Sequence, residues 1–190
     1  LRKSLKTIED YRISNPHYTD LLDILAEILI LREAYRKQMK QPIFSVEAKL
    51  ISGKMAGGLP LVDLAGQKYD LTRPREYFYT LVAIAEKKMP EQAHKFLEII
   101  RDEQFNWEKI IRASFNPGPA EEEAPEEDFT ATGDNDEQLD LIDLFLEESL
   151  RPELEVVAEQ YGALVEKAGW AEGYCPICGK EPKIGEIREK

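Results

Sequence analysis

The fold is decided by residues 137–168, which read EQLDLIDLFLEESLRPELEVVAEQYGALVEKA. Apolar residues recur there at intervals of three and four, which places them on one side of an α-helix. The stripe comprises Leu141, Phe145, Leu154, Val157, Ala158, Tyr161, Leu164 and Val165. Pro152 lies in the middle of this stretch and has no amide hydrogen to donate. We therefore expect either a kink near residues 148–151 or two abutting helices.

The preceding part of the chain shows the same helical periodicity. Asn15 and Pro16 form a start signal, and a central core helix is expected over residues 16–40. Further helices are expected at 45–51, 74–88 and 90–115, with an extended loop, GLPLVDLAGQKYDL, at 58–71. No strand pair or repeat is evident before residue 170. The sequence thus predicts a mainly α protein whose body, residues 1–168, is a helical bundle of about five or six helices.

The negative charge of the chain is concentrated in one segment. The 190 residues carry a net charge of -12, yet residues 119–140 hold ten acids and no base. Removing these ten acids from the net charge of -12 leaves only -2 for the body. Self-repelling charge with prolines and glycines is typical of a solvated connector, so residues 117–136 are expected to be an acidic linker.

The same charge balance excludes some classes of partner. A general basic surface for nucleic acid or anionic membrane is absent from this composition, so we expect no nucleic acid partner. The opening residues, LRKSLKTIEDYR, lack the apolar centre of a signal peptide, and charges interrupt the longest apolar stretches. We therefore expect no membrane insertion and a cytoplasmic location, which is a reducing compartment.

The helical periodicity ends at Gly169, and the remaining residues, GWAEGYCPICGKEPKIGEIREK, are rich in glycine and proline. Cys175 and Cys178 are separated by two residues, a spacing at which two thiolates reach one tetrahedral metal ion, zinc or iron. Gly179 allows the backbone to turn after the second cysteine. Two other interpretations stay open: a redox dithiol with the C-x-x-C spacing of thioredoxin, and a pair of buried, unreactive thiols.

A tetrahedral site needs four ligands, and this chain offers few candidates. Besides the two cysteines it contains only His17 and His94, which lie in helical segments and are not assigned as ligands. The remaining ligands would come from downstream sequence that is missing here or from a second chain in a homodimer. We expect the chain to be a fragment of a longer protein, with residues 169–190 forming the start of an incomplete metal-knuckle domain.

Residues 144–182, LFLEESLRPELEVVAEQYGALVEKAGWAEGYCPICGKEP, resemble the FdhE family, the formate dehydrogenase accessory proteins. The family phrase is Leu-Arg-Pro in a helix, then Trp-x-x-Gly, then Cys-Pro-x-Cys-Gly-x-x-Pro. It matches Leu150, Arg151, Pro152, Trp170, Gly173, Cys175, Pro176, Cys178, Gly179 and Pro182. The GLPLVDL segment at 58–64 resembles the Gly-x-Pro-Leu loop of the family more weakly. Lys180 stands where serine is common, and the further C-x-x-C pairs of the family are absent.

The resemblance implies a cytoplasmic maturation factor that binds the catalytic subunit of a respiratory formate dehydrogenase and is not itself an enzyme. It also implies a rubredoxin-like or zinc-ribbon-like metal region. A thiol-disulfide oxidoreductase using Cys175 and Cys178 is the alternative function. A zinc ribbon for nucleic acid is a third hypothesis, and it would need clustered lysines and arginines in the missing sequence.

Two other groups of residues were candidates for function. Tyr77, Phe78, Tyr79 and Trp107 are aromatic residues at helical spacing, which favours core packing, with Tyr79 the most exposed. Glu147 and Glu148 are interpreted as part of a charge run and not as a positioned carboxylate pair, because adjacency in sequence does not place two carboxylates in a pocket.

Overall fold

The structure is a computed structural model that describes residues 1–64, 69–102, 105–115 and 136–180. All regular structure in these ranges is helical and none of it is strand, so the predicted mainly α class is confirmed there. The elements, with η marking 3₁₀ turns, are α1 (Arg2–Ser14), η1 (Pro16–Tyr18), α2 (Thr19–Gln38), η2 (Ala48–Leu50), α3 (Ile51–Ala56), α4 (Thr72–Lys88), α5 (Pro90–Arg101), α6 (Trp107–Phe115) and α7 (Asp136–Lys167).

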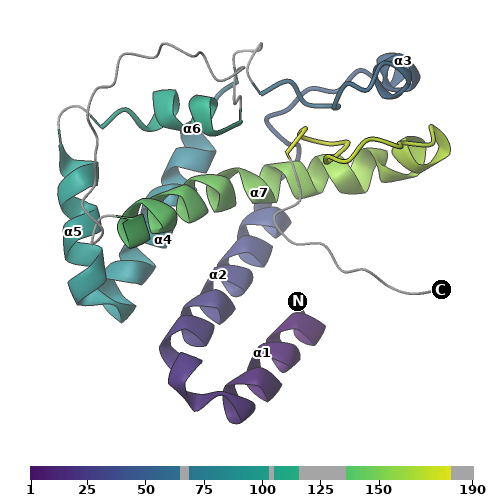
Figure 1. Ribbon diagram of the computed structural model, residues 1–190. Helices are drawn as coiled ribbons and strands as arrows, with labels where there is room; N and C mark the ends of the chain where they lie inside the picture. Colours follow the sequence, from purple (N-terminus) through teal and green to yellow (C-terminus); the bar gives the residue numbers. More distant parts are fainter. Residues whose placement is uncertain (65–68, 103–104, 116–135, 181–190) are drawn as a thin grey trace.

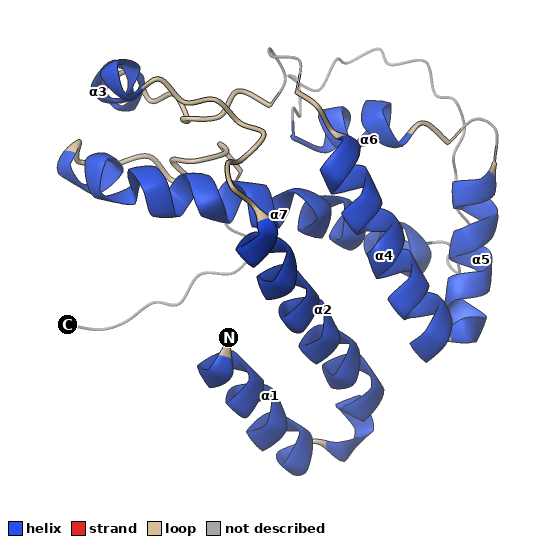
Figure 2. Ribbon diagram, turned by 180° about the vertical axis from the view of Figure 1, so that it is seen from behind, coloured by secondary structure: helices blue, strands red, loops and turns tan. Residues whose placement is uncertain are grey.

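Helix α7 is the central helix, against which most of the other helices pack. It contacts α2, α3, α4, α5 and α6, and Figures 1 and 2 show it running across the other helices from one end of the structure to the other. Helices α4 and α5 pack against each other and against its first half, whereas α3 lies against its second half. Helix α1 folds back on α2, and this pair extends away from α7.

The core forms where α4 crosses α7. Phe78, Leu81, Phe145, Leu146 and Val157 are fully shielded from solvent. Burying each large apolar side chain contributes roughly 1.5–3 kcal/mol. On α4 the buried positions recur every three or four residues. On α7 the stripe residues Phe145, Val157 and Val165 are buried as expected, whereas Leu164 is 42% exposed. The aromatic prediction is confirmed as well, because Tyr77, Phe78 and Trp107 are buried and Tyr79 is 46% exposed.

Several predicted helices agree with the structure. The core helix expected at 16–40 is present as η1 and α2, and the one expected at 74–88 is α4, which begins two residues earlier. The loop expected at 58–71 is irregular in its described residues. The acidic linker expected at 117–136 lies outside the described residues, apart from the first residue of α7.

Three predictions about helix number and extent were wrong. The described residues contain seven α-helices where five or six were expected, because α1 was not anticipated and the helix expected at 90–115 is divided into α5 and α6. The side chain of Asn106 accepts a hydrogen bond from the backbone N–H of Lys109 at 2.9 Å, which caps the start of α6. The short helix expected at 45–51 is displaced, since α3 begins only at Ile51.

Pro152 does not divide the long helix into two, which was one of the two outcomes expected for it. Helix α7 runs unbroken from Asp136 to Lys167. Proline removes one backbone hydrogen bond, to the carbonyl of Glu148, and buried side chains on either side of it hold the helix in place. Leu150 is 2% exposed, and Pro152 itself is fully buried. Packing against the neighbouring helices therefore outweighs the local cost of proline.

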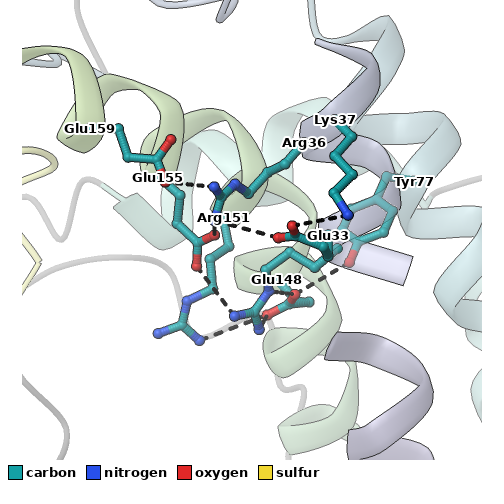
Figure 3. A network of polar contacts seen from close by, with 9 residues as sticks. Glu33, Arg36, Lys37, Tyr77, Glu148, Arg151, Glu155 and Glu159 are labelled. Atoms are coloured by element: carbon teal, nitrogen blue, oxygen red, sulfur yellow. Dashed lines mark hydrogen bonds and ion pairs between the residues drawn. The ribbon is translucent and has the colours of Figure 1, made fainter. Parts of the chain in front are cut away.

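A network of buried charges joins α2, α4 and α7 (Figure 3). Arg32 donates from Nε and Nη2 to the two carboxylate oxygens of Glu148, at 2.6 and 2.7 Å. The hydroxyl of Tyr77 donates to the same carboxylate at 3.3 Å, and Arg32 Nη1 reaches Glu155 at 3.2 Å. Glu148 is only 4% exposed. The sequence indicated only a charge run at this position, because it does not show which face of α7 meets Arg32.

A second buried carboxylate fastens the segment after α2. Glu153 is 1% exposed, and its Oε2 accepts the backbone N–H of Ile43 at 2.8 Å. Arg73 at the start of α4 lies 3.0 Å from Glu153 Oε1 and also donates to the carbonyl of Gln41 at 3.0 Å. Burial raises the pKa of both Glu148 and Glu153, against the opposing effect of their arginine partners.

We predict that Glu148→Ala lowers the free energy of unfolding by about 3 kcal/mol. The variant leaves the largely buried guanidinium of Arg32 with the more exposed Glu155 as its carboxylate partner. Urea denaturation measures this loss. The matched control is Glu159→Ala, which removes a carboxylate of the same helix that pairs with Arg36 at 2.5 Å but is 60% exposed. That variant should lose less than about 1 kcal/mol. Equal losses in the two variants would show that burial of the Arg32 pair is not important.

Candidate metal centre

The two cysteines lie in a short turn that follows α7. The chain leaves the helix through Gly169, whose φ of 69° lies in the left-handed region. The indole N–H of Trp170 then donates to the carbonyl of Tyr174 at 2.8 Å, and the two rings meet edge to face with centroids 5.2 Å apart. These contacts between Trp170 and Tyr174 hold residues 170–174 in a bend directly before Cys175.

Residues 175–180, which we call the cysteine turn, are closed by two backbone hydrogen bonds. The N–H of Gly179 donates to the carbonyl of Cys175, and the N–H of Cys175 donates to the carbonyl of Lys180, both at 2.8 Å. Gly179 has a φ of 76°, and an added Cβ would lie 3.1 Å from Pro60 Cγ. Only glycine suits both the left-handed backbone and this close approach. The predicted role of Gly179 is thereby confirmed.

The sulfur atoms of Cys175 and Cys178 face each other as free, half-buried thiols. A hydrogen bond from the Cys178 thiol, with help from the backbone N–H groups of Cys178 and Ile177, lowers the pKa of Cys175 to about 5 despite burial. The same shared proton, together with burial, raises the pKa of Cys178. Backbone amides that favour a thiolate also favour its use as a metal ligand.

The cysteine turn is bound to the helical body by residues 58–62, which we call the 58–62 loop. The N–H of Leu61 donates to the carbonyl of Pro176 at 2.9 Å, and the N–H of Val62 donates to the carbonyl of Ile177 at 2.8 Å. Ile177 is 7% exposed and belongs to the main hydrophobic core. The turn is therefore packed on the body, not suspended from the end of α7.

Two side chains add to this attachment. The hydroxyl of Tyr174 donates to the carbonyl of Gly58. Gly58 has a φ of 64°, a left-handed backbone conformation that favours glycine. The ammonium of Lys180 forms an ion pair with Glu147 of α7. Glu147, like Glu148, was interpreted as part of a charge run, and the structure gives it this defined partner. Sequence alone indicated only that the 58–64 segment resembled a family loop, not that it would meet the cysteines.

The turn contains two free thiols, which would be two of the four ligands of a tetrahedral ion. Thiolates are the ligands that zinc and iron prefer in such turns, and the backbone N–H groups of Cys178 and Ile177 lower the pKa of Cys175. Within the described residues, no third histidine, cysteine or carboxylate joins them in a group that could hold a metal ion. His17 and His94 are exposed on η1 and α5 and do not approach the turn. The residues present thus fit half of a metal site.

Comparison with known proteins adds one relative. The chain is 23% identical over 174 residues to a protein of Aquifex aeolicus (strain VF5) named "Protein FdhE homolog". The similarity covers 92% of this chain but 54% of the relative, so the chain spans about half the length of the curated protein it matches. No family model matches the chain. No solved structure matches it either.

The described part of the chain contains no helix of the length and apolar character needed to span a membrane.

We predict that, in the metal-free protein, iodoacetamide alkylates Cys175 with a pH profile whose midpoint lies near 5, far below the ordinary thiol value of 9.0. The rate should be constant above about pH 6 and should fall below the midpoint, because only the thiolate reacts. Cys178→Ala removes the S–H donor and should move the midpoint upward. An unchanged midpoint in that variant would contradict the shared proton between the two sulfurs.

Proposed function

We propose that the protein is an accessory factor for the maturation of a respiratory formate dehydrogenase, acting in the cytoplasm by binding the catalytic subunit of that enzyme and catalysing no reaction of its own. The observation that carries this proposal is the contact between the 58–62 loop and the cysteine turn. Both lie in parts of the sequence that resemble the FdhE family, residues 58–64 and 144–182, and more than a hundred residues separate the loop from the turn.

The relative supports the same proposal from an independent direction. The similarity to the protein named "Protein FdhE homolog" extends over 92% of this chain and is not confined to the cysteine motif. The helical body is thus part of the likeness, although it carries no recognisable catalytic motif in its sequence. A helical surface attached to a rigid cysteine turn suits a protein whose work is to hold another protein.

Cys175 and Cys178 are proposed as two ligands of a zinc or iron ion. The other ligands would come from a part of the protein beyond this sequence or from a second copy of the chain. When bound, the metal would cross-link the cysteine turn to those ligands and stabilise that end of the molecule. The backbone N–H groups of Ile177 and Cys178, which lower the pKa of Cys175, would stabilise its thiolate as a metal ligand.

One observation favours a second function, that of a thiol-disulfide oxidoreductase. The lowered pKa of Cys175 is also what an attacking thiolate needs, and the Cys178 thiol lies beside it to complete a disulfide. Against this, the described residues contain no strand and hence no strand-helix unit of the thioredoxin kind before the motif. A metal bound to both sulfurs would block the exchange reaction, so the two functions exclude each other.

The test is an affinity purification of the protein from its own cytosol while formate dehydrogenase is expressed, followed by metal analysis of the purified material. We expect the catalytic subunit of formate dehydrogenase to be recovered, with about one zinc or iron per metal site. The control is a Cys175→Ser variant, which should lose the metal. Recovery of no formate dehydrogenase subunit would refute the accessory role. A metal-free protein whose cysteine pair exchanges with thioredoxin would support the oxidoreductase instead.

A further inference from the structure

The two hydrogen bonds between the 58–62 loop and the cysteine turn are part of longer chains of polar contacts. On the loop, the ammonium of Lys54 in α3 donates to the carbonyls of Pro60 and Leu61, at 3.3 and 2.8 Å. These carbonyls belong to the same two peptide units whose N–H groups, on Leu61 and Val62, donate to the turn. Because C=O and N–H point in opposite directions across a trans peptide, one cation orients both units toward the cysteines.

The same geometry repeats within the turn. The carbonyls of Pro176 and Ile177 accept the two hydrogen bonds from the loop. The N–H groups on the other side of these peptide units, on Ile177 and Cys178, act on Cys175, whose pKa they lower. In each case the carbonyl of a peptide unit in the turn accepts a hydrogen bond from the N–H of a peptide unit in the loop.

Two parallel chains of peptide dipoles therefore connect one ammonium to one sulfur. The first runs from Lys54 through the Pro60–Leu61 and Pro176–Ile177 peptide units. The second runs from Lys54 through the Leu61–Val62 and Ile177–Cys178 peptide units. Every dipole in both chains has its positive end toward the sulfur. Hydrogen bonds aligned in series polarise one another, so a cation at one end strengthens the donors at the other.

We infer that Lys54 is a positioning residue for Cys175, acting through these two peptide chains to aim the Ile177 and Cys178 amides at the sulfur before any metal is bound. The inference deepens the proposed function, because it rests on the assignment of the cysteine turn as half of a metal site. It also gives the helical body a role in that site, since α3 holds Lys54 and the chain reaches the 58–62 loop directly from α3.

The structure offers a precise set of variants. Lys54→Met keeps the length of the side chain and removes its charge and donors, and Lys54→Arg restores a cation that can reach two carbonyls. Lys49→Met is the matched control, because Lys49 lies just before α3, is 78% exposed and forms an ion pair with nearby Glu47. Lys54→Gln, which keeps an uncharged donor, serves as a milder variant if the methionine variant is poorly folded.

The first measurement is amide hydrogen exchange in the metal-free chain of residues 1–190. In Lys54→Met we expect the amides of Leu61, Val62, Ile177 and Cys178 to exchange about tenfold faster, as for loss of one hydrogen bond. Amides in the middle of α7 should keep their protection, which shows that the fold is intact. Lys54→Gln should show a smaller effect in the same direction, and Lys54→Arg and Lys49→Met should resemble the unaltered chain.

The second measurement is a titration with Co²⁺ alone, followed by the thiolate-to-cobalt charge-transfer absorption. The dissociation constant should rise about tenfold in Lys54→Met and return in Lys54→Arg. Exchange rates and cobalt affinity that match the Lys49→Met control would overturn the role of Lys54. Faster exchange in Lys54→Met, with no charge-transfer band even in the unaltered protein purified as its own cells make it, would support the positioning role and refute the metal site of the proposed function.

Discussion

The pairing of Arg32 with Glu148 is the constraint from which the rest of the structure follows. It fixes the crossing of α2 and α7, and the Tyr77 hydroxyl brings α4 into the same contact. A carboxylate that is 4% exposed requires its partner, since an unpaired charge at that depth would be far costlier than the pair. Once this crossing is set, the apolar stripe of α7 has one orientation, and the core of α4 and α7 closes around it.

The orientation of α7 also determines where its end lies. Glu147, next to Glu148 in the chain, points to the other side of the helix and pairs with Lys180 in the cysteine turn. The turn is thereby held between α7 and the 58–62 loop, with Ile177 in the core. The same helix thus carries the buried Glu148 and the Glu147 carboxylate that pairs with the cysteine turn.

Much of this could be predicted from residue spacing, and the remainder depends on contacts between distant segments. The stripe around Phe145 and Val157 and the start signal at Pro16 correctly predicted long helices, because their cause is local. The break before α6 depends on the cap at Asn106, and the continuity through Pro152 depends on tertiary packing. The roles of Lys54 and Glu148 have no local signal, since each requires a partner that only the fold brings near.

X-ray absorption at the metal edge of the protein purified from its own cells tests the central claim most directly, namely that the helical body presents Cys175 and Cys178 as a preformed pair of metal ligands. The account predicts a zinc or iron ion whose first shell contains sulfur at about 2.3 Å, with fewer sulfur neighbours when both cysteines are replaced by serine. A spectrum unchanged by that double replacement, or a protein that contains no metal, would contradict it.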